Sequence, residues 1–179
     1  MFNKFSSNIN HNLIEATIRK SIEKVFFEVQ TEGITFGQLS TQLKDIWIKQ
    51  YAKKIKKSNL SSEKINEKLN EIAHFILKNE LMKFEADCVN ISGNIDAQKI
   101  RDFAKQIGFD QSSNGQNLLL IKEKRNKLAH GEFTFSEIGR NYSIQQLNDY
   151  KDEAKIYLED VINKIGIFIS NKTYKKIAV

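Results

Sequence analysis

The chain contains no proline, and only 8 of its 179 residues are glycine. These two residue types are the commonest helix breakers, so their scarcity favours long helices joined by short turns. Apolar residues recur at spacings of three and four along almost the whole chain, which is the period of an amphipathic helix. The length suits one domain with one core. The sequence therefore predicts an all-α protein with a single domain over residues 1–179.

Apolar stripes and capping residues place the individual helices. The predicted helices run from about 10 to 30, from Thr35 into the lysine-rich segment that ends at Lys57, from Ser61 or Ser62 to about Leu81, from Asp96 to Gly108, from 116 to 130, and from Ser143 to about Phe168. Phe133 and Phe135 alternate with polar residues, which predicts a short extended segment that reaches Gly139.

The charge balance favours a polyanionic partner. Lys and Arg number 28 against 22 Asp and Glu, so the net charge is +6. RNA is therefore an electrostatically reasonable ligand. The densest basic run comprises Lys49, Lys53, Lys54, Lys56 and Lys57. It has two interpretations: a contact surface for the RNA backbone, or a solvated helix end whose lysines complement the helix dipole, and the second is favoured.

The remaining composition argues against several classes of site. Cys88 is the sole cysteine, so neither an internal disulfide nor a cysteine-rich zinc site is expected, which is typical of a reducing, cytoplasmic compartment. His11, His74 and His130 are far apart in sequence, and no glycine-rich phosphate loop occurs, so we expect no metal and no cofactor. Secretory and membrane-spanning segments are likewise not expected. Acidic pairs such as Glu85 with Asp87, or Asp152 with Glu153, are interpreted as solvated helix faces.

The segment from Arg125 to Gly131 combines phosphate recognition with proton transfer at the end of one predicted helix. Arginine binds phosphate through two hydrogen bonds, and histidine has an unperturbed pKa of about 6.5, which allows proton exchange near neutrality. Asn126 and His130 are four positions apart and share a helix face, whereas Arg125 lies about 140° from His130 around the axis. Arg125, Asn126 and His130 are therefore the candidate catalytic residues.

At Arg125, Asn126 and His130 the sequence resembles the HEPN family, the higher eukaryotes and prokaryotes nucleotide-binding domain. The family signature is an arginine, a polar residue, three further residues and a histidine. The resemblance extends less sharply over about residues 10 to 170, and is to small stand-alone bacterial members. It implies an antiparallel bundle of four or five main helices with additional short helices. It also implies a two-fold homodimer in which the motifs of both subunits line one cleft.

The resemblance further implies a metal-independent endoribonuclease that serves as a toxin or phage-defence effector with a cognate antitoxin protein. In that function His130 exchanges protons with the RNA 2′-hydroxyl or the 5′-oxygen leaving group. Arg125 stabilises charge on the scissile phosphate, and Asn126 orients His130 or binds a phosphate oxygen. A 2′,3′-cyclic phosphate is the expected product.

Other interpretations of the same residues stay open. A catalytically inactive module that binds RNA or a partner protein carries the same motif, and His130 and Arg125 also suit a helix cap and a surface cation. In a related arrangement the antitoxin modifies a tyrosine two positions after the histidine, where this chain has Glu132, although Tyr142 lies downstream. The aromatic residues Phe133, Phe135 and Tyr142 either stack on bases or anchor their loop to the core, and the anchor is favoured.

Overall fold

The computed structural model describes residues 3–57, 60–85, 88–91 and 95–176, with only the backbone described for residues 3–12, 57 and 135. The helices are α1 (Asn3–Thr31), α2 (Thr41–Lys57), α3 (Ser62–Leu77), α4 (Ala97–Ile107), α5 (Gln116–Ala129), α6 (Phe135–Gly139) and α7 (Ile144–Ser170), with a 3-10 turn η1 (Phe36–Gln38). The described ranges contain no strand, only two isolated β-bridges. The predicted all-α class is confirmed. None of the described helices has the length and apolar character needed to cross a membrane.

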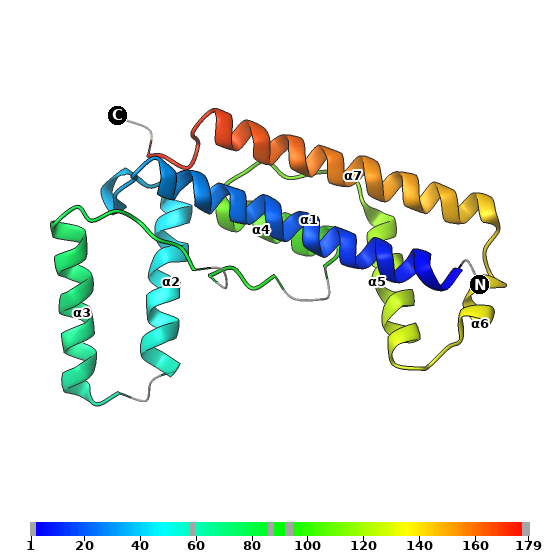
Figure 1. The fold of residues 1–179 in the computed structure, drawn as a ribbon, viewed down its shortest axis with the longest axis horizontal. Helices are drawn as coiled ribbons and strands as arrows, with labels where there is room; N and C mark the ends of the chain where they lie inside the picture. The colour runs from blue at the N-terminus through cyan, green and yellow to red at the C-terminus, as the bar shows by residue number, and fades with distance from the viewer. Residues whose placement is uncertain (1–2, 58–59, 86–87, 92–94, 177–179) are drawn as a thin grey trace.

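The two long helices α1 and α7 lie side by side and run in the same direction, as Figure 1 shows. At the end of the molecule where α1 finishes, α2 and α3 form an antiparallel hairpin that projects from this pair. At the opposite end, α5 and α6 project beside the first turns of α1 and α7. The candidate catalytic residues therefore lie at the far end of the molecule from the α2–α3 hairpin.

The core is built from the predicted apolar stripes of α1, α2, α4 and α7. Its buried side chains include Ile14, Ile18, Ile22, Val25 and Val29 of α1, Leu43, Ile46 and Trp47 of α2, Ile100, Phe103 and Ile107 of α4, and Leu158, Val161, Ile165 and Phe168 of α7. Burial of such side chains contributes roughly 1.5–3 kcal/mol each to folding. Since these positions recur every three or four residues, one face of each helix is committed to the core.

The segment from 119 to 153 has no buried side chain among those that the structure describes. Leu118 is the last core residue of α5, and the next one along the chain is Ala154 of α7. Several large apolar side chains in between are exposed, with Ile144 reaching 80% and Leu119 47%. The candidate catalytic residues all belong to this segment, so they stand outside the core.

Two sequence predictions about connecting segments are wrong. The segment after Phe133 is not extended, because Thr134 and Glu137 form a capping box that starts the short helix α6. The Glu137 carboxylate accepts the Thr134 N–H at 2.7 Å, and Thr134 Oγ1 accepts the Glu137 N–H at 3.2 Å. The second predicted helix does not begin at Thr35 either. There the Gln38 side chain accepts the Thr35 N–H at 2.9 Å, but only the turn η1 follows, and α2 starts at Thr41.

The predicted caps of the other helices are confirmed. Ser61 caps α3, Asp96 caps α4 through its bond to the Lys99 N–H at 2.8 Å, and Ser143 forms a capping box with Gln146 at the start of α7. Gly108 ends α4 in the left-handed conformation, with φ of 102°. Local sequence therefore determines where these helices begin and end.

Gly115 fixes the origin of α5. Its φ is 94°, a left-handed conformation that L side chains rarely adopt. A Cβ atom at this position would lie 2.8 Å from the Tyr157 ring of α7 and 3.0 Å from Ala97 Cβ of α4. The Tyr157 hydroxyl in turn donates to the Ala97 carbonyl at 3.3 Å. The first residue of α5 is thus packed between two other helices without room for a side chain.

We expect Gly115→Ala to lower the free energy of unfolding by about 3 kcal/mol. The alanine would have to adopt a left-handed conformation, and its Cβ would also overlap the Tyr157 ring. Urea unfolding measures the change. Gly166→Ala in α7 is the matched control, since its Cβ would meet nothing within 4 Å. There we expect stabilisation by up to about 1 kcal/mol from helix propensity. Equal stabilities for the two variants would contradict the close packing at Gly115.

Candidate catalytic site at the end of α5

The last turn of α5 ends in a Schellman motif that presents His130. Gly131 adopts a φ of 71° and its N–H bonds to the Leu128 carbonyl at 3.3 Å. The Glu132 N–H reaches back to the Lys127 carbonyl at 2.9 Å. These two bonds satisfy carbonyls that the helix end would otherwise leave unpaired. The predicted stop at Gly131 is confirmed, and it makes His130 the C-cap residue, with an exposed side chain.

The Arg125 and Asn126 side chains are joined, although they are neighbours that point to different sides of an ideal helix. Arg125 Nη1 donates to Asn126 Oδ1 at 3.0 Å, and both residues are half-buried. This bond brings the guanidinium round toward the Asn126 side of α5. The Asn126 carbonyl accepts the His130 N–H at 2.9 Å, one turn further on. The structure therefore places a guanidinium and an amide together in one turn of α5, and an imidazole one turn further along the chain.

The His130 ring receives no hydrogen bond from any residue that the structure describes. In particular, it does not cap the last carbonyls of α5, which are bonded instead to the N–H groups of His130, Gly131 and Glu132. The interpretation of His130 as a simple helix cap has no support in this geometry. Among the residues that the structure describes, no side chain is bonded to the imidazole to orient it for proton transfer.

Glu153 of α7 holds the start of α5. Gly115 has no side chain with which to cap the helix, and the Glu153 carboxylate supplies the missing acceptor to the Asn117 N–H at 3.2 Å. The same carboxylate accepts the Asn117 side-chain amide. A negative charge at a helix N-terminus is favourable because it meets the positive end of the helix dipole. The interpretation of Glu153 as part of a solvated face is therefore wrong, whereas Asp152 beside it is exposed as expected.

An ion pair between α4 and α5 holds the middle of the motif helix. Lys122 bonds to one oxygen of Asp96, and the other oxygen caps α4 at the Lys99 N–H. Both side chains are mostly buried. Burial raises the pKa of the Asp96 carboxyl, but the hydrogen bonds from Lys122 and from the Lys99 N–H outweigh that effect and hold the pKa below its usual range. Sequence reasoning identified Asp96 as a cap but not its partner, because the two residues are 26 positions apart.

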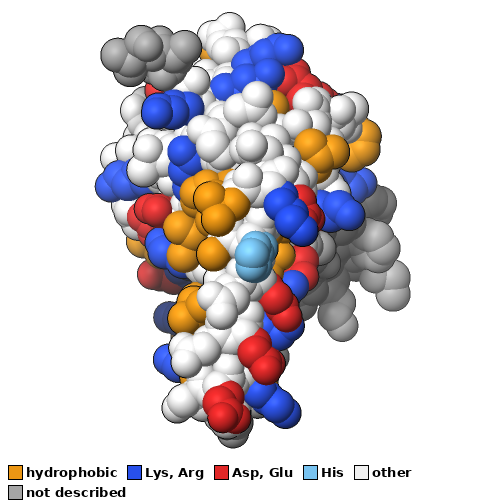
Figure 2. Space-filling model, turned by 90° about the vertical axis from the view of Figure 1, so that its left-hand side faces the viewer, with side chains coloured by type: hydrophobic (Ala, Val, Ile, Leu, Met, Phe, Trp, Pro, Cys, Tyr) orange, Lys and Arg blue, Asp and Glu red, His pale blue; other side chains and the backbone are white. Residues whose placement is uncertain are grey.

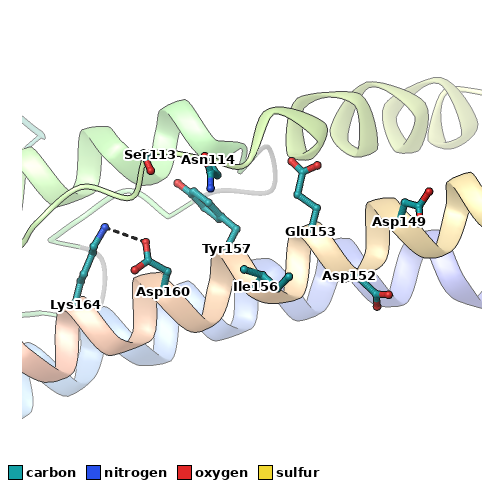
Figure 3. Close-up of a pocket in the computed structure, with 9 residues that line it drawn as sticks. All are labelled: Ser113, Asn114, Asp149, Asp152, Glu153, Ile156, Tyr157, Asp160 and Lys164. Atoms are coloured by element: carbon teal, nitrogen blue, oxygen red, sulfur yellow. Dashed lines mark hydrogen bonds and ion pairs between the residues drawn. The ribbon is translucent and has the colours of Figure 1, made fainter.

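A pocket of about 710 Å³ lies along α7, near the start of α5 and away from the motif. It is lined by Ser113, Asn114, Asp149, Asp152, Glu153, Ile156, Tyr157, Asp160 and Lys164 (Figure 3). Lys164 donates to Asp160 at 2.9 Å and to the Gln111 carbonyl at 2.7 Å, so its charge is matched locally. The hydrogen bond from Lys164 holds the pKa of Asp160 below its usual range. The surplus of carboxylates makes this pocket unfavourable for a phosphate backbone.

One lysine near the end of α2 is matched by an acidic side chain, since Lys54 pairs with Glu85. On the side of the molecule where α3 lies, acidic and basic side chains are interspersed (Figure 2). His74 is exposed in the last turn of α3 rather than packed in the core. Among the described residues no group of three or more histidine, cysteine or acidic side chains is arranged to hold a metal ion, and Asp87 lies outside those residues.

In a comparison with protein-family models, residues 11–174 match the model described as HEPN_MAE_28990-like HEPN. That range includes the core helices, Gly115, the ion pair between Asp96 and Lys122, and all three candidate catalytic residues. No significantly similar curated protein and no significantly similar solved structure was found.

Asp96→Asn keeps an acceptor for the Lys99 N–H but leaves Lys122 without its counter-charge, so we expect a loss of about 1–2 kcal/mol in unfolding free energy. Asp96→Ala also removes the cap and costs about 1 kcal/mol more. Because folding lowers the pKa of Asp96, the ionised carboxylate stabilises the fold fully above its unfolded pKa of about 3.9. The deficit of Asp96→Asn should therefore shrink as the pH falls below about 4 in urea titrations.

Asp152→Asn is the matched control for these variants, because Asp152 is exposed and its Lys151 contact is 3.8 Å long. Its effect should stay within about 0.5 kcal/mol at every pH. A deficit of Asp96→Asn that is independent of pH would contradict the ion pair.

Proposed function

Since this chain belongs to the HEPN family, we propose that it is a metal-independent endoribonuclease, with one domain over residues 1–179 and a site formed by Arg125, Asn126 and His130. The observation that supports the proposal most directly is the side-chain bond of 3.0 Å between Arg125 and Asn126 beside the exposed His130. An arginine next to a histidine suits phosphodiester chemistry, which requires charge stabilisation and proton transfer together. RNA is the substrate because its 2′-hydroxyl supplies an internal nucleophile.

In the proposed reaction an imidazole removes the proton from the RNA 2′-hydroxyl, and the 2′-oxygen attacks the adjacent phosphorus. The bond from phosphorus to the 5′-oxygen breaks, and an imidazolium returns a proton to that oxygen. The products are a 2′,3′-cyclic phosphate and a 5′-hydroxyl. Arg125 stabilises the negative charge that grows on the phosphate oxygens, and Asn126 fixes the guanidinium beside the phosphate.

The proposed site is completed by a second copy of the chain. The attacking and leaving oxygens lie on opposite sides of the phosphorus, so two imidazoles are better placed than one to act as base and acid. Two His130 side chains related by a two-fold axis satisfy this requirement. The absence of buried side chains from 119 to 153, among those described, supports a partner surface here, because Leu119 and Ile144 are left exposed in the single chain.

The proposed biological role is that of a toxin or phage-defence effector, acting in the cytoplasm and controlled by a cognate antitoxin. Glu132 stands two positions after His130, where related toxins have a modified tyrosine, so control of this chain does not follow that arrangement at the same position. Tyr142 is half-buried against the Lys124 ammonium, 5.7 Å from its ring centroid. It remains the tyrosine of this segment that a modifying antitoxin would reach.

A second candidate function is an RNA- or partner-binding module without catalysis. The observation that favours it is the His130 ring, which no described residue of its own chain orients. A binding module needs Arg125 but does not need an oriented imidazole. The two functions therefore differ in whether RNA is cut and in whether a substitution of His130 abolishes the activity.

We expect the purified protein to cut RNA in excess chelator and to leave cyclic phosphate ends. His130→Ala and Arg125→Ala should each lower the cleavage rate by about 100-fold or more, since each removes a group that acts in the transition state. His74→Ala is the matched control, because His74 is an exposed histidine on α3. RNA that binds but stays intact would favour the binding module, and cleavage that survives both substitutions would refute the assignment.

We expect a dimer in sedimentation velocity at micromolar concentration. Leu119→Glu places a charge on the exposed face of α5 and should shift the protein to monomer, with a parallel loss of cleavage. Leu77→Glu is the control, because Leu77 is 77% exposed on α3, away from the motif. A monomeric wild-type protein that still cuts RNA would show that the second copy is not required.

A further inference from the structure

We propose that Phe133 and Tyr142 form a nucleobase-stacking site beside Arg125, Asn126 and His130, so that the protein selects RNA whose bases are unpaired next to the scissile phosphate. This inference rests on the proposed function and adds the residues that hold the bases. Neither ring belongs to the core, and both are brought to α5 by the connection that runs through α6.

Two lysines of α5 hold these rings against the motif helix. Lys127 Nζ lies 5.4 Å from the centroid of the Phe133 ring, and Lys124 Nζ lies 5.7 Å from that of Tyr142. In sequence the two lysines flank Arg125 and Asn126. The motif is therefore bracketed by two pairs, each consisting of an ammonium and an aromatic ring.

The two pairs are products of tertiary folding. Elsewhere among the described residues, Lys24 with Phe27, Lys54 with Tyr51, and Lys99 with Phe103 are three or four positions apart on one helix, where helical spacing alone brings them together. Lys44 of α2 with Phe36 of η1, eight positions apart, is the other described pair that does not lie on one helix. Lys127 and Phe133 are six positions apart and Lys124 and Tyr142 are eighteen apart, across the end of a helix. The chain must turn back along α5 to form them.

Neither ring anchors the loop to the core, which corrects the favoured sequence interpretation for Phe133 and Tyr142. Phe133 is 44% exposed, and no described side chain from 119 to 153 is buried. Tyr142 is half-buried, with an edge contact to Tyr150 at 5.9 Å between ring centroids. Phe135 has no described side chain. The two rings thus expose apolar surface next to the candidate site, without a role in the core.

Lysine ammonium groups and aromatic rings in alternation are the chemistry by which proteins hold single-stranded nucleic acid. The ammonium groups contact phosphates, and a ring face stacks on a base, which contributes roughly 1–3 kcal/mol per base. Phe133 follows His130 by three residues, so their Cα atoms are at most about 11 Å apart. A base on Phe133 therefore belongs to a nucleotide close to the phosphate at His130. Bases within a duplex are already stacked and cannot occupy such a site.

The experiment measures binding in the His130→Ala protein, so that RNA is not consumed. The probes are a short unstructured RNA labelled with a fluorophore and the same strand annealed to its complement. Phe133→Leu and Tyr142→Leu remove the ring face but keep an apolar side chain, whereas Phe133→Tyr and Tyr142→Phe retain it. Phe27→Leu is the matched control, since Phe27 is 57% exposed and lies 5.1 Å from Lys24 Nζ near the opposite end of the molecule.

We expect each leucine variant to weaken binding of the single strand by about tenfold, which corresponds to about 1.4 kcal/mol. Binding of the duplex should change less than about twofold, and the two ring-retaining variants and Phe27→Leu should bind like the parent. The slope of affinity against salt concentration should stay unchanged in the leucine variants, because they remove no phosphate contact. Sedimentation velocity and thermal unfolding should match the parent.

Three results would overturn the inference: leucine variants that bind the single strand like the parent, equal losses for single strand and duplex, or dissociation of the dimer by either leucine substitution. The last result would assign the rings to a protein interface. Failure of the proposed enzymatic activity can be told apart from failure of the stacking site. If the wild-type protein leaves RNA intact, the enzyme is refuted, but weaker single-strand binding by the leucine variants would still support stacking. If the first of these results is found while wild-type cleavage still depends on His130, the stacking site is refuted and the proposed enzyme stands.

Discussion

The meeting of three helices at Gly115 sets the geometry on which the candidate site depends. Gly115, whose backbone is left-handed, caps the start of α5 and lies against Tyr157 of α7 and Ala97 of α4. Glu153 then accepts the Asn117 N–H in the first turn of the helix, and the ion pair between Asp96 and Lys122 holds the helix at its middle. These contacts all lie in the first half of α5. The second half leaves the core with its direction fixed and with no buried side chain, and it carries Arg125 and Asn126, which are half-buried, and leads to the exposed His130.

This division of α5 separates the residues that pack against the core from those of the candidate site. The first half carries Leu118, the last core residue before Ala154 of α7, and its polar contacts are tertiary ones that hold the helix in place. The second half contributes nothing to the core, so its residue types are free to serve recognition: a guanidinium, an amide, an imidazole and two lysines with aromatic partners. Exposed apolar side chains such as Leu119 and Ile144 cost solvation free energy in the single chain, which a second copy of the chain would recover.

Periodicity and capping chemistry predicted most of the fold because both are local. Asp96, Ser143 and Gly131 form their capping hydrogen bonds with groups a few residues away, so the sequence predicts their roles at the helix ends. The prediction of an extended segment at Phe133 and Phe135 was wrong because the alternation of two side chains is a weaker determinant than the capping box between Thr134 and Glu137. Glu153 was misassigned for a different reason. Its partner, Asn117, is 36 residues away, and no pattern near Glu153 indicates it.

Side-chain type and spacings within one or two turns account for the helical class, the side-chain types of the motif and the glycine that ends its helix. Contacts between distant parts of the chain account for two further features: Phe133 and Tyr142 fold back onto α5, and no described side chain from 119 to 153 is buried. Those features depend on the direction in which α5 leaves the bundle. That direction is set by packing at Gly115 between helices distant in sequence, and packing of that kind has no local signature.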